Sequence, residues 1–228
     1  MTALILQARL DSSRLPGKSL LPLGGEPLVF RVMEALAGIP CGIRVLACPE
    51  DDAASFKALA LRAGFEVVTG PGEDVLARFC GVIRRYGPER IIRATGDNPF
   101  VFADAAETLA GEAAALDADY AGYAGLPLGA GVEAVKAEAL LRAEKEAAEP
   151  AEREHVCPYL YRHPELFRLH RPLAPRRWQD PGKSGSGGFR LTVDTPEDYD
   201  RAQKRYRALD REGPGRGRGT AVLGAGPL

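Results

Sequence analysis

Residues Ala3 to Leu20 read ALILQARLDSSRLPGKSL, and this stretch decides the predicted fold. Its first four residues are apolar, which predicts a buried strand. A polar loop follows at once and carries three cations, Arg9, Arg14 and Lys18. Guanidinium and ammonium groups beside hydroxyls and loop amides suit phosphate oxygens, and three cations suit a triphosphate better than a single phosphate. The alternative is a solvated loop that happens to be basic.

Strand-like apolar runs alternate with amphipathic, helix-like segments along the rest of the chain. Such alternation predicts right-handed crossovers and an α/β fold, a three-layer α/β/α arrangement around a mostly parallel mixed sheet. We expect strands at residues 3–6, 43–47, 65–68, 90–95, 119–123, 167–170 and 189–193, helices at 27–37, 51–63, 73–86, 103–116, 137–148, 152–162 and 195–209, and loops at 126–131 and, mobile, at 172–188.

Length and composition are those of an ordinary globular protein. With 228 residues, 45% of them hydrophobic and 27% charged, the chain is long enough to bury a substantial core. We expect one domain over residues 1–211 and a flexible tail, rich in Gly and Arg, over residues 212–228. The last residues of that tail look like a Rossmann strand entering its glycine turn, so the start of a truncated second domain stays an alternative.

The charge pattern argues against two classes of partner. The net charge is −1, so no global field favours nucleic acid or an anionic membrane. No apolar run approaches the roughly 20 residues that span a bilayer, and no charged region precedes the first apolar stretch. We therefore expect a cytoplasmic protein.

The four cysteines lack metal-ligand spacing and are expected to be free thiols.

Two carboxylates follow predicted strands. Asp97 comes after the strand at 90–95, and Asp194 comes after the strand at 189–193. Ligands of open α/β sheets bind beyond the carboxyl ends of the strands, so both acids are expected to face the basic loop. Carboxylate oxygens facing a triphosphate are what Mg²⁺ requires. The alternatives are a turn-forming role for Asp97 and a helix-capping role for Asp194.

One phosphate-binding motif is excluded. Gly182-Lys183-Ser184 is the ending of a P-loop, but the motif needs a glycine five positions before Gly182. Arg177 stands there, and no strand precedes it. The P-loop interpretation is rejected.

Several stretches resemble the cytidylyltransferases that activate sugars, such as the acylneuraminate and 3-deoxy-manno-octulosonate enzymes, and most of all their spore-coat polysaccharide branch. The resemblance begins with QARLDSSRLPGKSL and covers roughly residues 2–207. Four further stretches follow in the same order: EDVLAR at 73–78, RATGDNP at 93–99, EREHV at 152–156 and LTVDTPED at 191–198.

The resemblance implies a glycosyltransferase-A-like fold and Mg²⁺-dependent transfer of CMP from CTP to a sugar or sugar acid, with release of pyrophosphate, for surface polysaccharide biosynthesis. Asp97 and Asp194 would be the metal ligands, and Arg14, Lys18 and Asp97 the catalytic residues. The nucleotide would contact Leu6, Ala8, Arg9, Ser13, Arg14, Lys18, Thr95 and Gly96. The acceptor would contact Glu133, Arg153, Glu154 and His155.

One departure from the branch leaves the acceptor open. The stretch at 126–135 usually carries P-D-G-L-D-V-E, but Leu128 and Gly131 stand at the two Asp positions and only Glu133 remains. One rival hypothesis is a glycosyltransferase that uses a nucleotide-sugar donor, although no clear Asp-x-Asp motif follows a strand. A second is a nucleotide-binding module that has lost catalysis. Dimers are common in the family, and the sequence leaves a homodimer open, as it does CTP against another nucleoside triphosphate.

Overall fold

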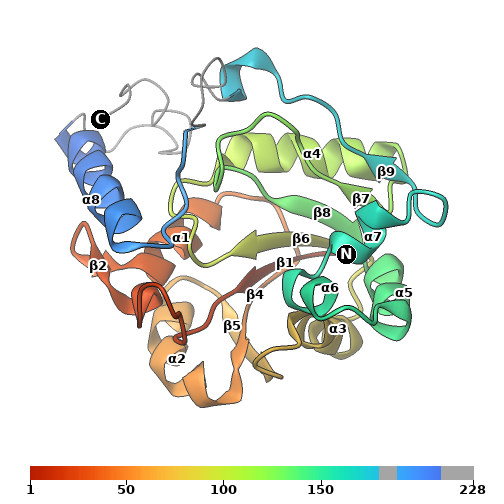
Figure 1. Ribbon diagram of the computed structural model, residues 1–228, viewed down its shortest axis with the longest axis horizontal. Coiled ribbons are helices and arrows are strands. Elements are labelled where there is room, and N and C mark those ends of the chain that lie inside the picture. Colours follow the sequence, from red (N-terminus) through yellow and green to blue (C-terminus); the bar gives the residue numbers. More distant parts are fainter. Residues whose placement is uncertain (180–188, 212–228) are drawn as a thin grey trace.

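A seven-stranded mixed sheet forms the centre of the protein in this computed structural model, which describes residues 1–179 and 189–211 (Figure 1). The strand order is β5-β4-β1-β6-β8-β7-β9. The four strands β5, β4, β1 and β6 are parallel, β8 runs antiparallel to β6 and β7, and β9 is parallel to β7. The strands are β1 (Thr2–Gln7), β4 (Ile43–Pro49), β5 (Glu66–Gly70), β6 (Arg90–Thr95), β7 (Tyr120–Ala121), β8 (Glu133–Lys136) and β9 (Leu169–His170), with a separate pair of β2 (Pro22–Leu23) and β3 (Glu26–Pro27).

Helices cover both faces of the sheet. Helices α1, α2, α4 and α8 pack on the face that carries Leu4 and Leu6 of β1, and α3, α5 and α7 pack on the face that carries Ala3 and Ile5. Successive residues of a strand point to opposite faces, so a strand buried on both faces is apolar throughout. The helices are α1 (Leu28–Leu36), α2 (Ala53–Arg62), α3 (Val75–Tyr86), α4 (Ala103–Ala115), α5 (Ala137–Glu146), α6 (Pro150–His155), α7 (Pro158–Arg162) and α8 (Pro196–Arg211).

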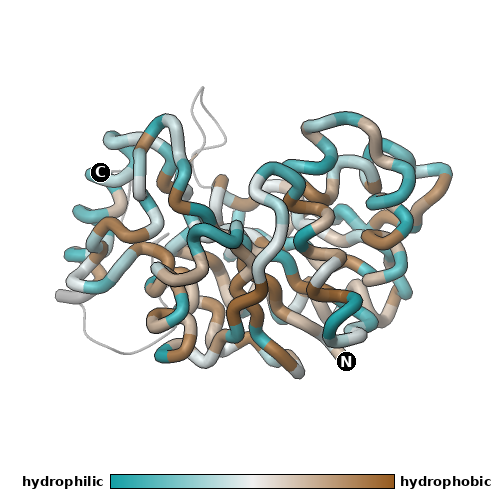
Figure 2. The backbone as a smooth tube through the Cα atoms, turned by 90° about the horizontal axis from the view of Figure 1, so that it is seen from below, coloured by the Kyte–Doolittle hydropathy of each residue, from teal (hydrophilic) through white to brown (hydrophobic). Residues whose placement is uncertain are grey.

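The three-layer architecture predicted from the sequence is confirmed. Figure 2 shows many of the hydrophobic stretches running through the middle of the molecule, with hydrophilic stretches on outer loops. Strand β8, which sequence analysis does not assign, closes the edge of β6. In residues 1–179 and 189–211, no helix is long and apolar enough to cross a membrane.

The predicted strand at 189–193 is wrong. This segment makes only an isolated bridge between Arg190 and Leu128. Its backbone follows the loop at 126–131, where the Leu128 N–H donates to the Phe189 carbonyl at 3.1 Å and the Leu191 N–H donates to the Leu128 carbonyl at 2.7 Å. Strand β1 pairs along all of β6, and β8 pairs with its first four residues, so only Ala94 and Thr95 lack a partner on one edge, which leaves little room for another strand.

The predicted helix at 152–162 is two helices. Helix α6 ends at His155 and α7 begins at Pro158. Between them lies Val156, a fully buried residue with φ of 71°. Positive φ at Val156 interrupts the helical backbone and is strained for a β-branched residue, and Pro158 takes the first position of α7, where its missing N–H is tolerated. The break turns the end of α6 away from the course of α7.

Part of the predicted mobile loop at 172–188 is packed against the protein. Trp178, in a short 3-10 helix at Arg176–Trp178, is fully buried, and its indole N–H donates to Asp104 Oδ2 at 2.9 Å. Burial of this large ring anchors the segment to α4. Residues 180–188, with the rejected P-loop ending, and the predicted tail at 212–228 lie outside the described residues.

Candidate active site

A cleft of about 530 Å³ lies beyond the carboxyl ends of β1 and β6. The basic loop after β1 forms one wall, the turn after β6 forms the floor, and α6 and the segment at 190–194 complete the walls. Of the residues predicted from the sequence, the cleft is lined by Ala8, Arg9, Ser13, Arg14, Lys18, Thr95, Gly96, Asp97, Glu154, His155 and Asp194.

Backbone contacts hold the basic loop in place. The Ser19 hydroxyl donates to the Arg9 carbonyl at 2.8 Å, and the Leu10 N–H donates to Asp52 Oδ2 at 2.9 Å. The tips of β1 and β6 approach closely at Gly96, where a Cβ atom would come within 3.0 Å of Ala8 Cβ. Only a glycine fits this approach without displacement, so the loop and the turn after β6 share one floor.

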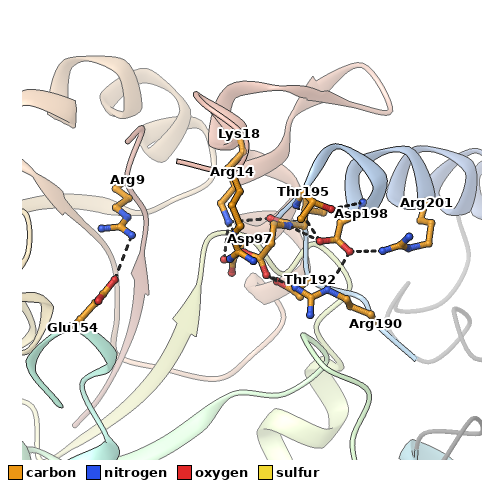
Figure 3. A network of polar contacts seen from close by, with 12 residues as sticks. Arg9, Arg14, Lys18, Asp97, Glu154, Arg190, Thr192, Thr195, Asp198 and Arg201 are labelled. Carbon is orange, nitrogen blue, oxygen red and sulfur yellow. Dashed lines mark hydrogen bonds and ion pairs between the residues drawn. The ribbon is translucent and has the colours of Figure 1, made fainter. Parts of the chain in front are cut away.

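Lys18 joins the two predicted metal ligands (Figure 3). Its Nζ donates to Asp97 Oδ2 at 3.0 Å, to Asp194 Oδ1 at 3.0 Å and to the carbonyl oxygen of Val193 at 2.9 Å. The Val193 N–H in turn donates to the Asp97 carbonyl at 2.8 Å. Residues from the beginning, middle and end of the chain therefore converge on one cation, as the sequence predicts for the two acids.

Further cations and a helix terminus fix Asp194. Arg14 lies 3.2 Å from its Oδ1 and Arg190 lies 2.6 Å from its Oδ2. The Asp194 N–H donates to Asp198 Oδ2 at 3.0 Å, at the start of α8. Burial opposes ionisation of Asp198, but backbone N–H donors and Arg190 outweigh it and lower its pKa. The Asp198 carboxylate is therefore anionic at neutral pH, and the contacts with Arg14, Arg190 and Asp198 together restrict where the Asp194 side chain points.

The oxygen atoms around Lys18 suit a divalent metal ion. They comprise two carboxylates and one carbonyl, which are hard donors of the kind that Mg²⁺ prefers. They already surround one positive charge at hydrogen-bonding distance. Among the described residues, no cluster of three or more His, Cys, Asp or Glu side chains offers a competing metal site. The oxygen donors of these residues therefore fit a divalent metal ion.

The opposite wall of the cleft comes from α6. Arg9 Nη2 lies 3.4 Å from Glu154 Oε1, and each side chain is 47% exposed (Figure 3). His155 lines the cleft beside Glu154. An ion pair this exposed contributes little stability, so both groups can exchange partners when a ligand enters.

Three predicted site residues do not line this cleft. Leu6 is fully buried in the core of the sheet. Arg153 points away and donates to Asp74 Oδ2 at 2.8 Å and to the carbonyl oxygens of Glu144 and Ala147, which ties α6 to α3 and α5. Its position is that of a structural residue. Glu133 lines a second, neighbouring cavity.

The cleft also contains cations that sequence analysis did not assign. Arg78 of α3 is 1% exposed, and burial lowers its pKa. It donates to the Pro71 carbonyl at 3.1 Å, while its Nε has no hydrogen-bond partner among the described residues. Arg93 and Arg190 also line the cleft. Two of these arginines stand in stretches that the sequence analysis had already singled out. EDVLAR ends in Arg78, and RATGDNP begins with Arg93.

A second cavity of about 340 Å³ adjoins the cleft. It lies over β8 and the loop at 126–131. The two cavities share the wall formed by Arg93, Thr95, Asn98, Leu128 and Gly129. A molecule in the second cavity would therefore lie directly beside one in the cleft.

Comparison with known proteins shows the family of the chain. A cytidylyltransferase family profile matches residues 3–211. The spore coat polysaccharide biosynthesis protein SpsF of Bacillus subtilis is 35% identical over 210 residues, which are 89% of this chain and 85% of SpsF.

Solved structures share the fold. A cytidylyltransferase from Leptospira borgpetersenii superposes with a TM-score of 0.86 at 22% identity and covers 98% of this chain and 92% of its own. A CMP:2-keto-3-deoxy-manno-octonic acid synthetase in complex with CTP has a TM-score of 0.69 at 16% identity and covers 93% and 99%. The chain belongs to the cytidylyltransferase family and is a nucleotidyltransferase.

Proposed function

We propose that this protein transfers CMP from CTP to a hydroxyl of a sugar or sugar acid, with Mg²⁺, and releases pyrophosphate for surface polysaccharide biosynthesis. The observation that carries the proposal is the convergence of Asp97 and Asp194 on Lys18 at the floor of a cation-rich cleft. This convergence supports a metal site and a triphosphate site at one place.

The names of relatives support the choice of substrates. SpsF is described as a spore coat polysaccharide biosynthesis protein, and the octonic acid synthetase was solved with CTP bound. The same two descriptions motivate CTP as the nucleotide and a surface polysaccharide as the destination.

The cations would receive the triphosphate in two ways. Lys18, whose side chain is 13% exposed and lies between the acids, would turn from these oxygens onto the phosphates when Mg²⁺ takes its place, and there it would offer a point charge. Arg14, with a side chain 61% exposed, can turn from Asp194 onto phosphate oxygens, where its planar fork makes paired hydrogen bonds. Arg9 stands at the other end of the loop. Together they would neutralise charge that develops on departing pyrophosphate.

The reaction is an in-line displacement. The acceptor oxygen forms a bond to the α-phosphorus, the bond between that phosphorus and the oxygen bridging to the β-phosphate breaks, and its electron pair leaves with pyrophosphate. The hydroxyl proton passes to solvent. Positioning and electrostatic stabilisation supply most of the catalysis in such transfers.

Asp97, Asp194 and the carbonyl of Val193 would hold Mg²⁺. When bound, the ion polarises phosphate oxygens and makes a hydroxyl a better nucleophile. The same three oxygens would position the metal against the triphosphate, because the Val193–Asp97 backbone hydrogen bond keeps the two acid-bearing segments together.

A pyrophosphate-release screen tests this function. Four nucleoside triphosphates with Mg²⁺ are combined with a panel of sugars, sugar acids and amino sugars, and release is expected with CTP. Asp97→Ala should abolish release while CTP still binds. The matched control is Asp200→Ala, an exposed acid that does not line the cleft. Consumption of a nucleotide-sugar donor without pyrophosphate would instead support a glycosyltransferase.

A further inference from the structure

The place of Asp194 in the cleft depends on helix α8, which begins just after it. Only Thr195 separates Asp194 from Pro196, the first residue of the helix. The Asp194 N–H donates to Asp198 Oδ2 at 3.0 Å, so the backbone of Asp194 is part of the N-terminal cap. Any movement of α8 would therefore move this carboxylate.

Lys18 is connected in a similar way to the hairpin of β2 and β3. It opens the short 3-10 helix at Lys18–Leu20, and the Leu21 N–H donates to its carbonyl oxygen at 3.1 Å. The hairpin follows at once, and Figure 1 shows it close to α8. The two groups that meet in the cleft, Lys18 and Asp194, are therefore carried by two elements that also lie beside each other.

One backbone carbonyl joins α8 to the hairpin. The Pro22 carbonyl oxygen accepts hydrogen bonds from the Tyr199 hydroxyl and, at 2.7 Å, from Gln203 Nε2. Gln203 Nε2 also donates to the Tyr199 hydroxyl oxygen at 2.7 Å, so the three groups hold one another in place. Tyr199 and Gln203 are four residues apart and lie on one face of the helix.

Tyr206 extends this face of α8 by almost another turn and packs against the hairpin turn. It is 2% exposed, and the Arg31 guanidinium lies over its ring at 4.8 Å from the centroid. A Cβ atom on Gly24 would lie 2.1 Å from Tyr206 Cε1, far inside the distance of van der Waals contact. Only a glycine at position 24 permits this approach without displacement.

The same ring also packs against the segment that carries Asp97. The ring centroids of Tyr206 and Phe100 are 6.5 Å apart and their planes are tilted by 43°, which is a favourable arrangement for two aromatic rings. Phe100 is 1% exposed and lies three residues after Asp97. Side chains on one face of α8 therefore contact the segments behind both Lys18 and Asp97.

Asp194 needs more than its local backbone contact to be held in place. The Val193 N–H donates to the Asp97 carbonyl at 2.8 Å, but one hydrogen bond does not determine the direction of the helix that follows. Tyr206 lies ten residues after Pro196, which is about 15 Å along an α-helix. Contacts that far along α8 restrict its tilt, and with it the place of the cap.

We propose that the contact between α8 and the hairpin positions Asp194 against Lys18 and Asp97, so that a divalent metal ion can bind. The residues of this α8–hairpin interface are Pro22, Gly24, Tyr199, Gln203 and Tyr206, and none of them lines the cleft. They are positioning residues that act through Asp194. The inference rests on the proposed function, in which Asp194 is a metal ligand.

The first experiment compares Gly24→Ala with Gly25→Ala. The methyl group at position 24 would overlap the Tyr206 ring and displace α8, whereas a Cβ atom on Gly25 meets nothing. Both glycines have positive φ, 58° and 82°, so both variants carry backbone strain. We expect Mn²⁺ alone, measured by the electron paramagnetic resonance of the free ion, to bind Gly24→Ala about tenfold more weakly than Gly25→Ala, as happens when groups that orient metal ligands are lost. Equal affinities overturn the inference.

The second experiment repeats Gly24→Ala in a Tyr206→Leu background. Leucine is shorter than tyrosine, so the methyl group no longer displaces α8. We expect Gly24→Ala to weaken Mn²⁺ binding when Tyr206 is present and to have almost no effect when Leu replaces it, because the two positions are coupled through their contact. The same loss of affinity in both backgrounds would mean that position 24 acts through its own backbone strain, which overturns the inference.

The third experiment uses Gln203→Met, a mild change that keeps the length of the side chain and removes the hydrogen bonds to Pro22 and Tyr199. A residue with a merely structural role would lower the unfolding free energy and leave the Mn²⁺ affinity of the folded protein unchanged. We expect the affinity to fall about fivefold, the size of one net hydrogen bond. Lys204→Met, at an exposed position on the same helix, is the matched control. Equal affinities in Gln203→Met and the control overturn the inference.

Pyrophosphate release from CTP and Mg²⁺ separates this inference from the proposed function. If the wild-type protein releases pyrophosphate and all variants bind Mn²⁺ equally, the proposed function stands and the inference is wrong. If the wild-type protein neither binds Mn²⁺ nor releases pyrophosphate with any acceptor, the proposed function itself is contradicted, and the inference fails with it.

Discussion

In the proposed function, Lys18 would compete with the metal ion for the same oxygens. In Lys18→Met the oxygens of Asp97, Val193 and Asp194 lose their resident cation. We expect Mn²⁺ alone, as a probe, to bind this variant at least about tenfold tighter than the wild-type protein in the absence of nucleotide, because unpaired carboxylates attract a divalent ion strongly. Titration followed by the electron paramagnetic resonance of free Mn²⁺ measures this. Lys57→Met, at an exposed site, is the control, and equal affinities would contradict competition.

Gly129 fixes the wall between the two cavities. Its φ is 93°, and a Cβ atom would lie 2.5 Å from the Thr192 nitrogen and 2.9 Å from Asn98 Oδ1. Gly129→Ala should cost about 1–3 kcal/mol of unfolding free energy, as strained backbone conformations do, and should also lower kcat/KM because Thr192 and Asn98 line the cleft. Urea denaturation and steady-state kinetics check both. Gly72→Ala, where a Cβ meets nothing, should leave both values unchanged.

The N-terminus of α8 carries the cap that positions Asp194. Asp198 Oδ2 accepts from the backbone N–H groups of Asp194 and Thr195 at 3.0 Å each, and the Thr195 hydroxyl oxygen accepts from the Asp198 N–H at 3.2 Å. Asp198→Ala should lower the unfolding free energy by about 2 kcal/mol, since it removes a helix cap and leaves Arg190 with one partner fewer. Denaturant unfolding measures the loss. Asp200→Ala, at an exposed position on the same helix, should show almost none.

The same carboxylate predicts how stability depends on pH. The pKa of Asp198 is lowered below its ordinary value of 3.8, so the unfolded chain takes up this proton first as the pH falls. Its contribution is therefore complete well above pH 3.8 and is lost as the pH falls through the lower folded value. Unfolding curves recorded down through this window should be steeper in pH for the wild-type protein than for Asp198→Ala. Parallel pH profiles would contradict the role of the charge.

At the scale of the whole molecule, the cleft joins segments that are far apart in the sequence. Lys18, Asp97 and Asp194 come from three distant segments, so a ligand that contacts them should stabilise the entire fold. CTP with Mg²⁺ at 100 times its Kd should raise the unfolding free energy by about 2.7 kcal/mol. Denaturant unfolding with and without the ligands measures this. In Asp194→Asn the additional stabilisation that depends on Mg²⁺ should disappear. If Mg²⁺ stabilised this variant as much as the wild-type protein, Asp194 would not be a metal ligand.

The local pattern of apolar, polar and charged residues determined much of the secondary structure of this protein. The sequence predicts three features of the site directly, because burial and turn formation depend on neighbouring residues. These are the apolar run that becomes β1, the basic loop that follows it, and the two acids, one after the strand at 90–95 and one at 194. The start of α8 is equally local, with Thr195 as its cap and Pro196 as its first residue. These features identified both the fold and the cation-rich loop.

Tertiary structure alone decided how the groups are paired. The segment at 189–193 has the composition of a strand, yet it follows a loop because β1 and β8 pair with nearly all of β6. Lys18 and Asp194 lie 176 residues apart in sequence, and the two carboxylate oxygens of Glu133 accept hydrogen bonds from Arg93 and Tyr120. Such pairings depend on which surfaces meet when the layers pack, and no local periodicity encodes them. The sequence by itself determined the layers and the charges, and the packing decided which charges remain free to bind a substrate.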